Sequence, residues 1–360
     1  MMNLIDISKK LSNSQLTEII NINNLNKESD IFLKINKQKL EDYEKKRINS
    51  KEYLKKIVII FNSTNYGEVS SESEQYLLTK INTTEFISKS TSDQIKIIEN
   101  SIVLFTNNIF AEIGIEKLFQ LKNIASNTLW VVQDYDNHHW IENSIQVAIF
   151  SDIYVPSHMD GEIGLLGKIN SNITEFIPCG SNQWSTNFIN NNINNLKLKG
   201  RNESPFGTYY FYDKFKTRNK YISILNSFFC DIKITEIDFH KLTQKEKWAI
   251  WTERSIHWII PTANDLPIRF FDALLTGGLP IVPVTLRQYL KILGINNKYY
   301  LTYNQNDIYN PNKLINEARI KISQGGDVAL RERSNFALNN FHVNAIIKKI
   351  YNAVKTINNN

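Results

Sequence analysis

One stretch in the second half of the chain constrains the fold more than any other. Residues 256–260 (IHWII) predict a buried strand, and residues 279–284 (LPIVPV) predict a second strand directly after the glycine pair 277–278. Between them, helically spaced apolar residues and Pro267 predict a short helix, whose start Asp265 can cap. Strand, loop, helix, glycine pair and strand make a βαβ unit, which belongs to a parallel sheet.

The loop before this helix lies at the carboxyl end of a strand. Open α/β sheets bind ligands at that edge, and a helix N-terminus there attracts phosphate. Asn264, Asp265, Arg269 and Asp272 fall in this loop and helix. The spacing lets Arg269 pair with both carboxylates on the helix surface. The alternative is that Arg269 binds a phosphate, while Asn264, Asp265 or Asp272 binds hydroxyl groups of a sugar or ribose.

The rest of the chain extends the same pattern over two domains. A length of 360 residues is enough for two, and predicted strands alternate with helices in both halves. We therefore expect an α/β protein with two Rossmann-like, doubly wound domains. In the first half we also expect a helix near 74–81 and a strand at 171–178. The expected parts are a helical extension at 1–55, a first domain at 56–182, a linker at 183–204, a second domain at 205–335 and a C-terminal helix at 336–360.

Composition indicates a globular chain in a reducing compartment. Hydrophobic residues make up 42% and charged residues 22%, which is typical of soluble domains. The formal charge of +6 is compatible with a phosphate-bearing ligand, an anionic membrane surface or no specific partner. Cys179 and Cys230 form neither a metal-type spacing nor a disulfide framework. No stretch approaches the ~18 apolar residues of a membrane span, and the N-terminus lacks a secretory signal. We expect a cytoplasmic protein.

The N-terminal extension allows two interpretations. Residues 1–55 predict amphipathic helices with Lys and Glu on the outer face. They can form a cap packed on the first domain. Alternatively, the basic cluster 45–47 (KKR) can make them a partner-binding or membrane-surface element, which implies peripheral contact at the inner face of the membrane.

A second polar cluster follows the strand predicted at 128–133. Asp134, Asp136, His138 and His139 come directly after it. A histidine near a ligand-binding edge can act as a general base at neutral pH. The same side chains can instead bind a metal ion, or bond their own loop, although neighbours in a tight loop rarely converge on one ion.

Four basic residues, Lys214, Lys216, Arg218 and Lys220, follow the strand predicted at 209–212. This loop is the first βα turn of the second domain, which in doubly wound sheets faces the ligand crevice. A phosphate site and a solvated charged surface are both compatible with the run.

Several signatures are missing from the sequence. It has no G-x-G-x-x-G, no G-x-x-x-x-G-K-[ST] and no G-x-S-x-G, which disfavours dinucleotide binding, P-loop nucleotide hydrolysis and the α/β-hydrolase elbow. The basic residues are not interleaved with aromatic ones, so we expect no nucleic-acid partner.

Residues 272–282 (DALLTGGLPIV) resemble the donor-binding segment of glycosyltransferases with the GT-B fold, "Glu-Ala-Leu-Ala-x-Gly-x-Pro-Val-Val". The resemblance covers roughly residues 55–358 and includes the glycosyl transferases group 1 and exostosin-like forms. Many members carry two glutamates eight positions apart here. Asp272 stands at the second position, and Asn264, beside Asp265, stands at the first. Residues 177–180 (IPCG) also resemble the family's turn at the end of the first domain.

The resemblance implies two Rossmann-like domains facing a cleft, with the C-terminal helix returning to the first domain. The implied donor-binding residues are Asp272, Arg269, Asp265, Asn264, Lys214, Arg218 and Lys220. The implied catalytic residues are His138, His139 and Asp136, and the implied acceptor-binding residues are Asn65, Gly67 and Asp134.

The implied reaction moves a sugar from a nucleotide-sugar donor to a glycan or lipid-linked acceptor, as in bacterial surface polysaccharide or glycoconjugate synthesis. No metal ion or other cofactor is expected, because protein cations can neutralise the departing diphosphate. Two alternatives remain, a nucleotide-sugar epimerase of the same fold and a non-catalytic subunit that binds a sugar or nucleotide.

Overall fold

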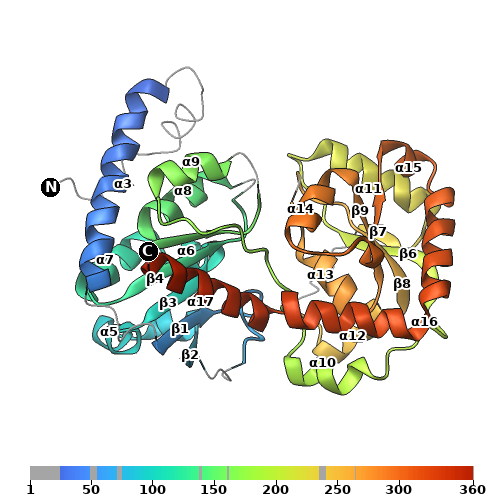
Figure 1. The fold of residues 1–360 in the computed structure, drawn as a ribbon, viewed down its shortest axis with the longest axis horizontal. Helices are drawn as coiled ribbons and strands as arrows, with labels where there is room; N and C mark the ends of the chain where they lie inside the picture. Colours follow the sequence, from blue (N-terminus) through green and yellow to red (C-terminus); the bar gives the residue numbers. More distant parts are fainter. Residues whose placement is uncertain are drawn as a thin grey trace. The chain divides into compact units, whose positions relative to one another are not determined.

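The structure is a computed structural model that describes residues 25–48, 55–70, 75–137, 140–159, 162–234, 241–263 and 265–359. The predicted site residues His138, His139 and Asn264 lie outside these ranges. The chain forms two compact units, Met1–Pro178 with Ile347–Asn360, and Cys179–Ile346 (Figure 1). Within the described ranges, no helix combines the length and the apolar character needed to cross a bilayer.

The first unit is built on a five-stranded parallel sheet in the order β2-β1-β3-β4-β5. The strands are β1 (Lys56–Phe61), β2 (Leu77–Asn82), β3 (Ile102–Thr106), β4 (Leu129–Asp134) and β5 (Ile153–Pro156). Every residue of β3, β4 and β5 is buried, as expected for a parallel sheet covered on both faces.

Two local predictions in this unit are wrong. Residues 77–82 form the edge strand β2, paired with β1 along its whole length, where we expected a helix. Leu78 and Ile81 are spaced as on a helix, but pairing with β1 decides the conformation, and Lys80 binds the carbonyl oxygens of Gly67 and Val69 at 2.8 and 2.6 Å. Residues 171–178 form only an isolated bridge, between Ile173 and Tyr154.

Helices cover both faces of this sheet (Figure 1). They are α3 (Leu25–Ile48), α4 (Thr83–Ser88), α5 (Thr91–Ile98), α6 (Asn107–Ile113), α7 (Ile115–Ile124), α8 (Ile141–Phe150), α9 (Glu162–Ile169) and most of α17 (Val343–Asn359). The core is aromatic at its centre, where Trp130 and Phe105 meet the ring of Phe150.

Helix α3 packs on this unit through one face. Ile35, Lys39 and Tyr43 recur every four residues and are buried. Within the basic cluster 45–47, Lys46 pairs with the buried carboxylate of Asp152 at 2.7 Å. That lysine therefore serves the packing of α3 on the unit.

The second unit has the same strand order as the first. Its sheet is parallel, with β10-β9-β8-β6-β7 as neighbours, so in each unit the second strand lies beside the first and the third to fifth follow on the other side. The strands are β6 (Asn202–Tyr209), β7 (Ile232–Ile234), β8 (Arg254–Trp258), β9 (Leu279–Pro283) and β10 (Leu301–Tyr303). The predicted class, α/β with two Rossmann-like doubly wound domains, is confirmed.

Two helices of the second unit do not respect the domain boundaries that we expected from the sequence. The helices of this unit are α10 (Thr186–Ile193), α11 (Lys216–Phe228), α12 (Gln244–Thr252), α13 (Ile268–Leu275), α14 (Arg287–Ile292), α15 (Gln305–Tyr309) and α16 (Asn312–Phe341), with 3-10 turns at Val284–Leu286 and Asn297–Tyr299. Helix α10 lies in the segment expected as a linker, because Ser185 caps it and Ile189 and Ile193 are buried. Helix α16 continues past the expected boundary at residue 335 and ends at Phe341, and the backbone of the cap residue His342 is extended.

The βαβ unit predicted around residues 256–284 is β8, α13 and β9. Helix α13 starts at Ile268 without a side-chain cap. Asp265, expected to cap it, instead accepts a hydrogen bond from the backbone N–H of Thr262 at 2.6 Å. Gly277 has a φ of +77°, as a helix-ending glycine should. A Cβ on Gly278 would lie 2.2 Å from the ring of His257 in β8, so helix and strand approach closely there.

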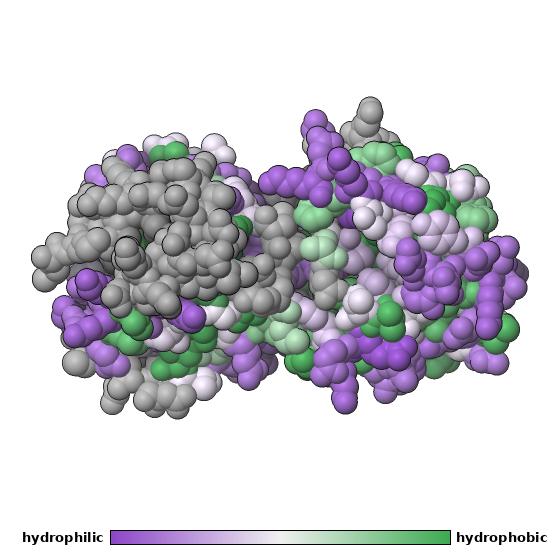
Figure 2. Space-filling view, turned by 90° about the horizontal axis from the view of Figure 1, so that it is seen from above, coloured by the Kyte–Doolittle hydropathy of each residue, from purple (hydrophilic) through white to green (hydrophobic). Residues whose placement is uncertain are grey.

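Figure 2 shows hydrophilic side chains over much of the second unit, with small hydrophobic patches between them. The large apolar side chains lie mainly inside, where Trp258, Phe270 and Phe271 are among the biggest that are fully buried. This packing holds the strand ends at fixed positions, which determines where the loops at the sheet edge can meet.

Candidate functional site

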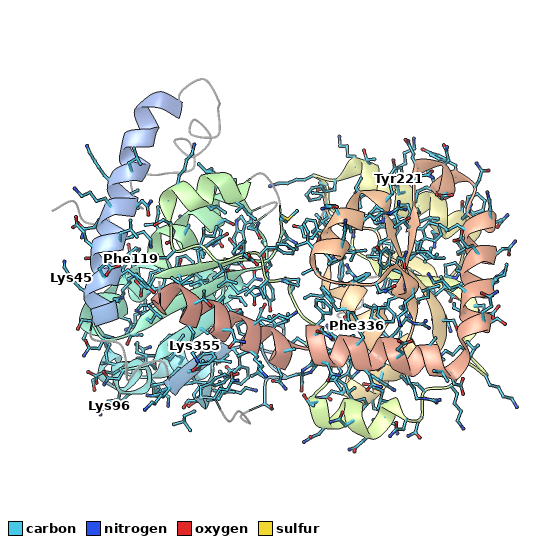
Figure 3. All side chains as sticks on the ribbon, viewed as in Figure 1. Lys45, Lys96, Phe119, Tyr221, Phe336 and Lys355 are labelled. Carbon is cyan, nitrogen blue, oxygen red and sulfur yellow. The ribbon has the colours of Figure 1, made fainter. Side chains whose placement is uncertain are left out.

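A pocket of about 570 Å³ opens at the carboxyl edge of the second unit's sheet. Its walls come from the segments that follow β6, β8, β9 and β10, and Tyr221 of α11 adds to them (Figure 3). In this strand order, the connections after β6 and β8 leave in opposite directions. Doubly wound sheets bind ligands at such a switch point.

The segments that line the pocket differ in polarity and charge. Its apolar groups include Phe215, Ile260, Pro283 and Val284. The segment after β6 contributes the charged residues Lys214, Lys216 and Arg218, whereas the segments after β9 and β10 contribute the uncharged polar residues Thr285, Asn304 and Gln305.

The N-terminus of α11 forms part of the wall. This helix of 13 residues begins at Lys216, and no side chain caps it, because Phe215 occupies the cap position. Lys216, Thr217 and Arg218, the first three residues of the helix, all line the pocket. The backbone N–H groups of a first turn carry a partial positive charge and have no partner within the helix.

Two arginines lie against the ring of one buried tyrosine. The guanidinium carbon of Arg218 is 5.5 Å from the ring centre of Tyr209, and that of Arg269 is 5.6 Å from it. Arg218 is only 6% exposed and also lies over Tyr212, 5.2 Å from its ring centre. Its Nη1 donates to the carbonyl oxygen of Tyr210 at 2.7 Å, while its Nε is buried without a partner among the described residues.

Within the described residues, neither of these two guanidinium groups lies within ion-pair distance of a carboxylate. Neither Arg218 nor Arg269 forms an ion pair with a residue in the described part of the chain, so Arg269 makes neither of the pairs with Asp265 and Asp272 that its spacing allows. Burial and then the charge of Arg269 lower the pKa of Arg218. Burial raises the pKa of Tyr209 to about 12, so the ring between them stays neutral. The arrangement favours an anion.

Three of the four basic residues after β6 line the pocket, and the fourth does not. Lys214 and Arg218, both among the predicted donor-binding residues, line the pocket, and so does Lys216, which belongs to the predicted basic run but not to those donor-binding residues. Lys220 is exposed on α11 and is not a lining residue. Gln305 was missed entirely, because the loops after β9 and β10 carry no motif.

Asp272 and Asp265 both bond to protein groups. Asp272 is 2% exposed, accepts a hydrogen bond from Ser181 Oγ at 2.6 Å, and is not a lining residue of the pocket. Burial raises the pKa of Asp272 to about 7. Asp265 is buried and bonded to Thr262. Donor contacts by either carboxylate remain predictions.

Ser181 is held by the junction between α16 and α17. Its backbone N–H donates to Phe341 O at 2.8 Å, and its carbonyl oxygen accepts from Val343 at 2.9 Å. A Cβ on Gly180 would lie 2.6 Å from Phe341 O, so only glycine fits this approach. The turn that resembles the family's "Ile-Pro-Asn-Gly" thereby places the hydroxyl that bonds to Asp272.

In the first unit, Asp134 is an interior group. It is 0% exposed, and its carboxylate accepts from Tyr154 Oη at 2.7 Å and from the backbone N–H of Asp136 at 3.0 Å. Burial raises the pKa of Asp134 to about 6. Asp136 is partly exposed and accepts from Asn107 Nδ2 at 2.8 Å. Of the two carboxylates, Asp136 is the one that solvent reaches.

The other two predicted acceptor residues shape the loop after β1. The side chain of Asn65 is buried and donates to Asn62 Oδ1 and Thr64 Oγ1 at 3.1 and 2.8 Å. The carbonyl oxygen of Gly67 accepts from Lys80. Within the described residues, no three His, Cys, Asp or Glu side chains gather as metal ligands would.

No protein-family model matches the sequence, and no curated protein matches it. Among solved structures, the chain is similar to sucrose-phosphate synthase from Thermosynechococcus elongatus, with 12% identity and a TM-score of 0.47. The match covers 87% of this chain and 91% of that one. A likeness at this level says nothing about activity, so the function is argued from the pocket.

Proposed function

We propose that the protein is a glycosyltransferase that uses a nucleotide-activated sugar, with the donor's diphosphate bound in the pocket of the second unit. The observation that carries the proposal is the pair of arginines on Tyr209, Arg218 and Arg269, neither of which forms an ion pair with a described residue. Arg218 lines the pocket beside Lys214, Lys216 and the uncapped start of α11. Guanidinium, ammonium and helix N–H groups are the donors that bind phosphate oxygens in proteins.

Transfer chemistry is supported by the segment that resembles the family. Residues 272–282 run from α13 into β9, and the end of β9 at Pro283 lines the pocket. Departure of a nucleoside diphosphate from the sugar develops negative charge on its phosphate oxygens. Fixed cations and a helix N-terminus would stabilise that charge, so the reaction needs no metal ion or other cofactor.

The acceptor, a glycan or a lipid-linked glycan of bacterial surface polysaccharide or glycoconjugate synthesis, would bind the first unit. Of the three predicted bases, Asp136 lies within the described residues and is partly exposed, and His138 and His139 are the other two. The protein would work in the cytoplasm, alone or in peripheral contact with the membrane.

The proposal is tested by nucleotide binding to matched lysine variants. Lys216→Ala removes an ammonium group from the pocket, and Lys220→Ala removes one from the same helix, one turn away and outside the pocket. By calorimetry, we expect Lys216→Ala and Arg269→Ala each to weaken binding of a nucleoside diphosphate about fivefold to tenfold. Lys220→Ala should change it by less than about twofold. Equal losses in the Lys216 and Lys220 variants would remove the pocket as the diphosphate site.

A turnover assay distinguishes the three candidate functions, which are glycosyltransferase, nucleotide-sugar epimerase and non-catalytic binding subunit. The sugar derivative of the preferred nucleotide is incubated with and without glycan acceptors, and the products are identified by mass spectrometry. Transfer that needs an acceptor supports the proposal. An altered sugar without acceptor indicates an epimerase, and binding without turnover indicates a non-catalytic subunit.

A further inference from the structure

We propose that Gln305, assisted by Thr285, contacts the hydrogen-bonding edge of the nucleobase and determines which nucleotide the pocket accepts. The inference rests on the proposed function, because it takes the ligand to be a nucleoside diphosphate. It concerns the end of the pocket opposite to the cations.

The polarity of the pocket orients such a ligand. The charged lining residues Lys214, Lys216 and Arg218 all follow β6, and the last polar lining residues, Asn304 and Gln305, follow β10. Strands β8 and β9 lie between β6 and β10, so the two ends are three strand spacings, or about 14 Å, apart along the sheet edge. An anionic group belongs at the β6 end and an uncharged hydrogen-bonding group at the β10 end. A nucleoside diphosphate has this polarity.

The middle of the pocket is lined mainly by apolar side chains. Ile260, Pro283 and Val284 contribute apolar surface there, beside the ring of Tyr303. The hydroxyl of Tyr303 is directed to the carbonyl oxygen of Ile259 at 3.3 Å. Apolar groups contact the faces of different bases alike, so discrimination has to come from groups at the base edge.

Two side chains in the segments after β9 and β10 are available for that role. Asn304 is already engaged, because its Oδ1 accepts from Asn306 N at 2.8 Å and caps α15. The carboxamide of Gln305 and the hydroxyl of Thr285 form no hydrogen bond with any described residue. A carboxamide places a donor and an acceptor side by side, which matches the edge of a nucleobase.

The substitution Gln305→Glu changes this edge without changing its shape. Uracil and cytosine have the same ring size and differ at N3 and at position 4, where uracil carries a carbonyl and cytosine an amino group. The carboxamide can donate to the first or accept from the second, whereas a carboxylate only accepts. We therefore expect Gln305→Glu to shift the ratio of UDP to CDP affinity about tenfold towards CDP.

The experiment measures binding of UDP, CDP and inorganic pyrophosphate to the full-length protein by calorimetry. Asn306→Asp is the matched control, because it adds the same charge one residue away, on a side chain that is exposed and does not line the pocket. The inference predicts that only Gln305→Glu shifts the UDP-to-CDP ratio, and that both variants change pyrophosphate affinity equally. Thr285→Val, similar in shape, should shift the ratio in a second, independent variant.

The outcomes distinguish this inference from the proposed function. If the wild type binds UDP and CDP, and Gln305→Glu changes both affinities by the same factor, the base-edge role is wrong while the proposed function stands. If the wild type prefers purines, IDP and ADP differ in the same way, a carbonyl against an amino group at carbon 6, and replace UDP and CDP under the same criterion. A wild type that binds neither nucleotides nor pyrophosphate overturns both.

Discussion

At the scale of single residues, burial decides what Asp272 can do. The sequence places it where a donor-binding carboxylate stands in the family that the chain resembles. In the structure its Oδ1 accepts from Ser181 Oγ, 91 positions away in sequence, and its side chain is almost fully covered. No local pattern in the sequence indicates such a partner, whereas the basic run that includes Lys214 and Arg218 was visible, because a cluster of charged residues directly after a predicted strand is a local feature.

The raised pKa of Asp272 predicts a pH dependence of stability. Its folded pKa is about 7 and its ordinary value is 3.8, so the folded state binds the proton more tightly. The free energy of unfolding should therefore fall as pH rises from about 4 to 7, by up to about 1.4 kcal/mol per pH unit, and then level off. Asp272→Asn removes this loss, so the melting temperature of the variant minus that of the wild type should increase from pH 5 to pH 7.

Asp134 titrates in both proteins, so its contribution cancels in the difference in melting temperature between variant and wild type. Asn keeps the shape and can still accept from Ser181. A difference in melting temperature that stays constant between pH 5 and pH 8 would show that Asp272 has an ordinary pKa in the folded protein.

At the scale of elements, lysines join α3 and α7 to the end of α8. Lys39 donates to Ile149 O at 2.8 Å and also to Ser151 O, and Lys122 donates to Phe150 O. Cations suit a helix C-terminus, where carbonyl oxygens lack partners. Asp152 pairs with Lys46 and Lys122 at 2.7 and 2.8 Å. Burial opposes its charge, but the two lysines together hold the pKa of Asp152 below its usual range.

Removing this one carboxylate should destabilise the first unit strongly. Asp152→Asn leaves several buried lysines without their counter-charge, and we expect a loss of about 3–5 kcal/mol in the free energy of unfolding. Asp42→Asn on α3, which breaks an exposed pair with Lys45, should cost less than about 1 kcal/mol. Urea denaturation at pH 7 measures both. Similar small losses would mean that the buried cluster adds little to the docking of α3.

At the scale of the whole molecule, the two units repeat one strand order, and the chain passes between them twice. It enters the second unit after Pro178 and returns to the first after Ile346, so α17 completes the first unit from the far end of the sequence. Ile347, Ile350 and Val354 are buried, and the Tyr351 ring lies 4.7 Å from that of Tyr76.

This path predicts that a change near the C-terminus weakens the N-terminal unit. Ile350→Ala leaves a cavity that should cost about 2–5 kcal/mol. In hydrogen exchange followed by mass spectrometry, we expect faster exchange in β1 to β5 and unchanged exchange in β6 to β10. Lys355→Ala, on the exposed side of α17, should change neither sheet. Faster exchange in β6 to β10 alone would contradict the assignment of α17 to the first unit.

The sequence by itself determined the features that depend on residues close together in the chain. Apolar, β-branched runs indicated most of the parallel strands, the stretch around residues 256–284 indicated a βαβ unit, and the run of basic residues indicated a positively charged loop in the second half. Each depends on residues within a few positions of one another, because strand formation, helix ends and local charge follow short-range rules.

Only the tertiary structure decided the features that join distant segments. Residues 77–82 became a strand because β1 was there to pair with them. Asp272 became a buried partner of Ser181, Arg218 and Arg269 met on one tyrosine ring, and Gln305 came to line the same pocket as Lys216, 89 positions earlier. These contacts depend on how the strands are ordered and packed, and no spacing within a single segment of the sequence encodes that order.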